Sequence, residues 1–113
     1  IQKLVKPFKE HIYRSHILHI PKGGYFPPHR DIPQYVKNQP SFRVLIPLKN
    51  CNPHKLYFVY EDKILNFEHG RAYFLNTNKS HTLFSYGDSY MVVLNVDCND
   101  ETKEILCKNF QVI

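Results

Sequence analysis

The sequence predicts an all-β sandwich or barrel. Six short segments rich in β-branched and aromatic residues alternate with clusters of glycine, proline and asparagine. The segments are residues 16–20, 42–48, 56–60, 71–75, 82–86 and 90–96. Many short strands separated by turn signals are typical of these two architectures.

Helical signal is confined to the two ends of the chain. Residues 100–108 begin at a possible cap, Asn99 or Asp100, carry acids in the first turn and end near Lys108. We therefore expect one C-terminal helix of roughly two turns. Residues 3–11 are expected to form no more than a short turn, because Pro7 interrupts them.

Length and composition favour one globular unit. The chain has 113 residues, 42% of them hydrophobic, so we expect a single domain over residues 1–113 with its core at about 13–97. No apolar run reaches the roughly 20 residues that span a bilayer. The net charge is +5, but the basic residues are scattered, which argues against a nucleic-acid partner. Three cysteines without C-x-x-C spacing predict a reducing compartment, with the cytoplasm as the expected location.

Two strands carry polar residues on a defined face. In residues 42–48, Arg43 and Leu45 alternate with apolar residues that face the other way. Arg43 is expected either at the rim of the barrel or pointing inward as an anion clamp, and the strand alone does not decide. His16 and His19 lie on opposite faces of one strand, so at most one points inward, and we expect a structural role.

His29-Arg30-Asp31 is the central chemical feature. In an extended segment, His29 and Asp31 point to the same side and present an imidazole and a carboxylate to one point. His81 follows fifty residues later at the start of an apolar segment. Two histidines and one carboxylate form the facial triad typical of non-haem Fe(II) oxygenases. The alternative is that His29 is a turn residue and His81 a solvated loop residue.

The order of these pieces resembles the aspartyl/asparaginyl β-hydroxylase family of Fe(II)/2-oxoglutarate-dependent oxygenases. The matching pieces cover roughly residues 13–97 and are 16–24, 28–31, 42–48, 70–76, 80–84 and 93–97. The resemblance implies a cupin-like double-stranded β-helix, or jelly roll, with His29, Asp31 and His81 as catalytic iron ligands. It implies a dioxygenase that hydroxylates an amino-acid side chain in a peptide, protein or small molecule.

The chain departs from the family at the 2-oxoglutarate anchor. Met91 stands where the family usually has a carboxylate-binding arginine, and Leu45 where some members have a histidine. Another cation could replace that arginine: Arg43 first, then Arg71, then Lys55. The co-substrate could also be another acid, or the site could bind metal without oxygenase activity.

Two other function classes therefore stay open. One is a cupin-like metal-binding jelly roll without oxygenase activity, which serves small-molecule binding or isomerase-type chemistry. The other is a structural or interaction β-domain that holds no metal.

Overall fold

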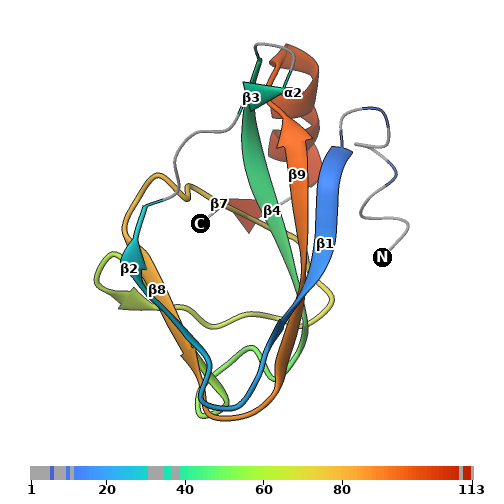
Figure 1. Ribbon diagram of the computed structural model, residues 1–113. Helices are drawn as coiled ribbons and strands as arrows, with labels where there is room; N and C mark the ends of the chain where they lie inside the picture. Colours follow the sequence, from blue (N-terminus) through green and yellow to red (C-terminus); the bar gives the residue numbers. More distant parts are fainter. Residues whose placement is uncertain are drawn as a thin grey trace.

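Two mainly antiparallel sheets face each other and converge at one end (Figure 1). The computed structural model describes residues 6, 10, 12–30, 35–36, 39–109 and 111–112. The larger sheet is ordered β1 (Ile12–Ile20), β9 (Ser89–Asp97), β4 (Gln39–Lys49), β7 (Tyr73–Leu75) and β10 (Gln111–Val112), with β3 (Tyr35–Val36) paired to β4. The smaller sheet is ordered β2 (Tyr25–His29), β8 (His81–Ser85), β5 (Leu56–Tyr60) and β6 (Lys63–Ile64).

The chain alternates between the sheets as it proceeds. β1, β4, β7 and β9 belong to the larger sheet, whereas β2, β5 and β8, which intervene in sequence, belong to the smaller one. This back-and-forth path makes the fold an all-β jelly roll, and the predicted fold class is confirmed. Sequence positions far apart are thereby brought to the two facing inner surfaces.

Each predicted segment overlaps a strand, and the structure adds the strand β2 and three two-residue strands, β3, β6 and β10. Strands β1, β4 and β9 extend beyond their predicted limits, and β7 begins two residues late. The longest unpredicted strand is β2, which contains Pro27 and Pro28. Prolines are tolerated there because β2 is an edge strand with only β8 beside it. Most of the predicted turn at residues 3–11 lies outside the described residues.

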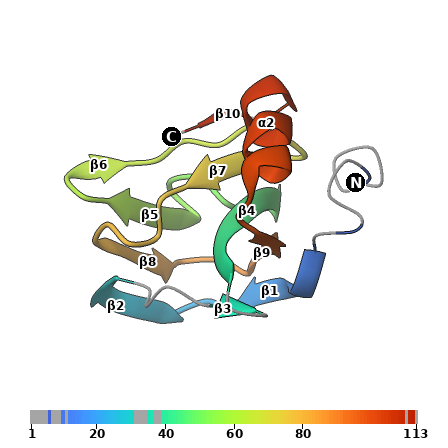
Figure 2. The same ribbon diagram turned by 90° about the horizontal axis from the view of Figure 1, so that it is seen from above.

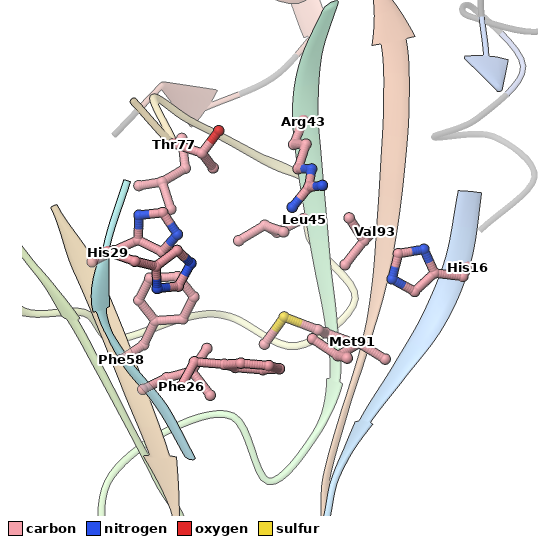
Figure 3. A pocket seen from close by; sticks show the side chains of 13 residues that line it. His16, Phe26, His29, Arg43, Leu45, Phe58, Thr77, Met91 and Val93 are labelled. Carbon is pink, nitrogen blue, oxygen red and sulfur yellow. The ribbon is translucent and has the colours of Figure 1, made fainter. Parts of the chain in front are cut away.

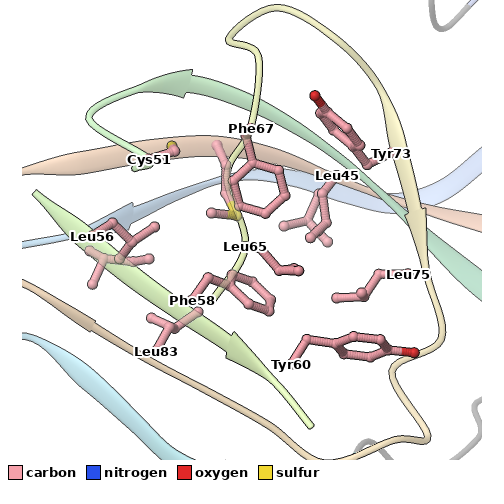
Figure 4. Packing of buried hydrophobic residues seen from close by; sticks show 13 residues of the cluster. Leu45, Cys51, Leu56, Phe58, Tyr60, Leu65, Phe67, Tyr73, Leu75 and Leu83 are labelled. Atoms are coloured by element: carbon pink, nitrogen blue, oxygen red, sulfur yellow. The ribbon is translucent and has the colours of Figure 1, made fainter. Parts of the chain in front are cut away.

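The space between the sheets holds the main core (Figure 4). Leu45, Met91 and Val93 from the larger sheet pack with Phe58 and Leu83 from the smaller one. Each of these side chains is at most 5% exposed. Burial of this apolar surface is the main term that holds the two sheets together.

The outer face of the larger sheet is covered by a helix, α2 (Asp100–Asn109) (Figure 2). Leu106 of α2 is buried in a second cluster with Val44, Ile46 and Val92. Strand β9 is therefore buried on both faces, which explains its nearly continuous apolar run. Of the two predicted caps, Asn99 is the one that caps α2, since its Oδ1 accepts from the Thr102 N–H at 2.9 Å. No helix in the described part of the chain is long and apolar enough to cross a bilayer.

The cysteines differ sharply in accessibility, which allows a simple labelling test. Cys51 is fully buried and donates to the carbonyls of Lys49 and Tyr90, whereas Cys107 is exposed. Burial raises the pKa of the Cys51 thiol, so it stays protonated at neutral pH and is a poor nucleophile. We expect a thiol reagent to modify Cys107 in the native protein, and Cys51 only after unfolding. Peptide mass spectrometry over time measures both, and equal native rates would contradict this packing.

Candidate metal centre

The site is built where the edge strand β2 meets β8. His29 and His81 are directly opposite each other in the register of this pair, and their ring centroids lie 4.3 Å apart. The register shifts by one residue between Phe26 and His29. Without that extra residue, Pro28 would oppose His81. The two prolines thus lie at an irregularity in the strand pairing, and this irregularity places His29 beside His81. β-Bulges often re-aim a side chain in this way near functional sites.

Each histidine is held in one tautomer by a backbone carbonyl. His29 Nδ1 lies 2.7 Å from the Pro27 carbonyl oxygen, and His81 Nδ1 lies 2.8 Å from that of Lys79. A carbonyl only accepts, so Nδ1 carries the proton in both rings. In the neutral ring, Nε2 is then the nitrogen with the lone pair, which is the form that ligates a metal. An Nδ1–H···O=C bond is also the usual second interaction of metal-binding histidines.

The surroundings of the pair are aromatic, and one of the two rings is buried. His81 is only 7% exposed, and the Phe58 ring lies parallel to it at 6.2 Å between centroids. His29 is half-buried, and its ring lies edge-to-face with that of Phe26 at 6.4 Å between centroids. The alternative of a solvated loop residue is therefore wrong for His81, which belongs to β8 and faces the interior. A hydrophobic shell of this kind restricts solvent access to a bound ion.

The carboxylate of the predicted triad is not placed. Asp31 lies outside the described residues, so its position relative to His29 and His81 stays a prediction. Among the residues that the structure describes, no group of three or more His, Cys, Asp or Glu side chains converges on one point. The two histidines fit a metal in donor type, tautomer and proximity, and the ligand set is completed only under the prediction for Asp31.

A cavity of about 220 Å³ lies between the sheets beside the histidine pair. Arg43 lines it from the larger sheet, across from His29 and His81 on the smaller one (Figure 3). Arg43 Nε donates to the Asn95 Oδ1 at 3.1 Å, and Asn95 is buried. Arg43 therefore points inward, toward the cavity. The next residue along the strand, Val44, points the other way and packs under α2.

The other candidate cations lie elsewhere. Arg71 is exposed and pairs with Glu68 at 3.1 Å, and Lys55 is exposed with its stem against Gly87. Neither lines the cavity, so of the three predicted cations only Arg43 does. Met91 is 1% exposed and lies in the cavity wall, so no arginine occupies that place.

Sequence reasoning missed His16 as a cavity residue. His16 lines the cavity from β1, whereas His19 faces outward and stacks on Tyr90 at 4.5 Å. His19 also donates to Asp88 at 3.3 Å, and this hydrogen bond lowers the pKa of the Asp88 carboxyl. The available signal was the alternation of His16 with Leu18 and Ile20, which places His16 on the inward apolar face of β1.

The comparisons with known proteins address the fold. No family model and no curated protein matches the chain. A crystal structure of a predicted oxalate decarboxylase from Thermotoga maritima matches 83% of this chain and 74% of that one, with a TM-score of 0.55 and 14% identity. The fold is a cupin-like jelly roll. At this identity the likeness shows the fold alone, so the resemblance to the aspartyl/asparaginyl β-hydroxylases stays a prediction.

Proposed function

We propose that this chain is an Fe(II)-dependent oxygenase that uses a 2-oxo acid, 2-oxoglutarate by the family resemblance, to hydroxylate an organic substrate. The observation that carries the proposal is the pair of histidines, 4.3 Å apart, with both Nδ1 atoms bonded to carbonyls beside a small cavity. Imidazole nitrogen is a suitable ligand for Fe(II), and one carboxylate would complete the facial triad. Asp31 is the proposed third ligand.

Each residue then has a defined task. Fe(II) held here would supply, with dioxygen and a 2-oxo acid, the oxidising power to hydroxylate an unactivated C–H bond. The carbonyls of Pro27 and Lys79 fix the orientation of the two rings. Arg43 would bind a carboxylate, and Asn95 would hold the guanidinium in place. The cavity is small enough that we propose a free small molecule or one extended side chain as the substrate.

A second candidate is a metal-binding jelly roll that does not act as an oxygenase. The specific observation in its favour is Met91, buried where the resembling family places a carboxylate-binding arginine. The matched structure carries the description of a predicted decarboxylase, which is a different chemistry on this fold. Metal binding alone therefore does not separate the two proposals.

An anaerobic titration separates them. Fe(II) is added to the protein and then 2-oxoglutarate to saturation, and the visible charge-transfer band of a keto acid chelated to iron is recorded. The oxygenase proposal predicts the band in the wild type and its loss in His81→Ala. Iron binding without a band would favour the second candidate, and failure to bind iron would contradict both.

Substitution of Arg43 tests the anion site independently of the metal. We expect Arg43→Gln to weaken 2-oxoglutarate binding at least tenfold, because a charge-assisted pair is lost, and to change Fe(II) affinity by less than about twofold. Arg71→Gln is the matched control, since Arg71 is exposed and outside the cavity. If the two substitutions weaken 2-oxoglutarate binding equally, as followed by the charge-transfer band, Arg43 is not part of the anion site.

A further inference from the structure

The cavity wall has a polar part and an apolar part. Its polar lining groups include His16, His29 and Arg43, which are exposed or half-buried, and His81, which is buried. The other part of the wall is formed by side chains that are at most 5% exposed: Leu45, Phe58, Leu75, Leu83, Met91 and Val93. Figure 3 shows Arg43 near one end of the labelled group, with Phe26 and Met91 toward the other. The cavity is therefore amphipathic.

The apolar part of the wall is unsuited to a second carboxylate. All six buried side chains in that part of the wall are hydrocarbon or thioether, with no donor among them. A carboxylate moved into such surroundings without partners is strongly unfavourable, whereas each buried methylene group is favourable. A volume of about 220 Å³ lies below the roughly 300 Å³ of the smallest common ligand pockets, so the occupant is small.

From this polarity we propose that the acid preferred by this cavity is a small monoacid with an apolar tail, and that 2-oxoglutarate, the co-substrate implied by the family resemblance, is a weaker ligand of the same site. Its carboxylate lies at the polar end, near Arg43 and the histidine pair, and its tail packs against Leu45, Met91 and Val93. The position of the carboxylate rests on the proposed function, and the position of the tail rests on the buried apolar side chains of the wall. A diacid with one carboxylate at the histidine pair and the other at Arg43 would leave the apolar side chains of the wall with no part of the ligand to contact.

A ligand series on the wild-type chain tests the inference. Binding of 4-methyl-2-oxopentanoate, 2-oxoglutarate and 4-methylpentanoate is measured by calorimetry, with and without Mn(II) as an inert substitute for Fe(II). We expect 4-methyl-2-oxopentanoate to bind at least tenfold more tightly than 2-oxoglutarate. Equal or tighter binding of 2-oxoglutarate, or no binding of the branched acid, would overturn the inference.

The same series distinguishes this inference from the proposed function. If Mn(II) does not bind but the branched acids do, the tail site stands and the metal proposal fails. If Mn(II) binds and 2-oxoglutarate is preferred, the metal proposal stands and the tail site fails. A preference for the 2-oxo acid over 4-methylpentanoate only when Mn(II) is present would identify the ligand as a chelating co-substrate. Equal binding of both acids would identify a simple carboxylate ligand, with the tail site intact.

A pair of neighbouring substitutions locates the tail. Leu45→Ala enlarges the buried end of the cavity, whereas Ile46→Ala removes similar volume from the opposite face of β4, under α2. We expect Leu45→Ala to shift the preference toward a longer acid, 2-oxooctanoate, by at least fivefold, and Ile46→Ala to leave the order unchanged. The same order in both variants would contradict a tail at Leu45. If either variant does not fold, the wild-type series still decides.

Discussion

Substitution of His81 by alanine should reduce divalent metal affinity by at least about a hundredfold. His81 is the most buried imidazole of the candidate site, and its Nδ1 is bonded to the Lys79 carbonyl, so Nε2 is the atom that would bind the ion. Loss of a partner that merely orients a ligand already costs about 10–100-fold in affinity, so loss of the ligand should cost at least as much. Co(II) titration followed by visible absorption measures this directly.

The matched control for this substitution is His54→Ala. His54 is exposed, bonds to the Tyr57 hydroxyl at 3.0 Å and does not line the cavity. We expect the Co(II) affinity of His54→Ala to stay within about twofold of the wild type. An unchanged thermal stability would show that the variant is folded. If His81→Ala binds Co(II) as tightly as His54→Ala does, the metal site is not at β2 and β8.

The largest stability effect is expected at Phe58. Phe58 is 3% exposed, packs edge-on against Phe67 at 5.8 Å and lies parallel to His81. Phe58→Ala should lower the free energy of unfolding by about 3–5 kcal/mol, because a cavity opens between the two sheets. Urea denaturation measures the loss as a lower midpoint concentration with an unchanged m-value.

Phe84 offers a control on the other face of the same sheet. Phe84 is 36% exposed and stacks on Tyr57 at 5.3 Å. Its substitution by alanine should cost about 1.5 kcal/mol or less, since much of the ring already contacts solvent. A similar loss for the two variants would mean that the inner face of β5 and β8 is not the core.

Strand content could be predicted because β-branched and aromatic runs end at clear turn signals. The runs in β4, β5 and β9 are of this kind, and the structure contains all three. Strand β2 could not be predicted, because its two prolines are read as turn residues unless the strand is known to be at an edge. The limits of β1 were missed since its first half pairs with β9 through an irregular register.

The residues of the candidate site could be predicted from the sequence in part, but their contacts could not. Chain order and residue type suffice to nominate His29 and His81, but their contact depends on the register of β2 with β8. The direction of Arg43 followed only from knowing which face of β4 the helix covers. Alternation groups His16 with Leu18 and Ile20 on one face of β1, but the contact of that face with the cavity depends on the pairing of β1 with β9. The amphipathic cavity is a property of both sheets together and has no local sequence signal.

Long-range ¹H–¹⁵N correlation spectra of the histidine side chains test the central claim most directly. The metal-free protein should show His29 and His81 as Nδ1–H tautomers, each with a hydrogen-bonded Nδ1 proton. One equivalent of diamagnetic Zn(II) should shift the Nε2 resonances of these two residues and leave that of His54 unchanged. Nε2–H tautomers at both positions, or a Zn(II) response confined to other histidines, would contradict a metal centre between β2 and β8.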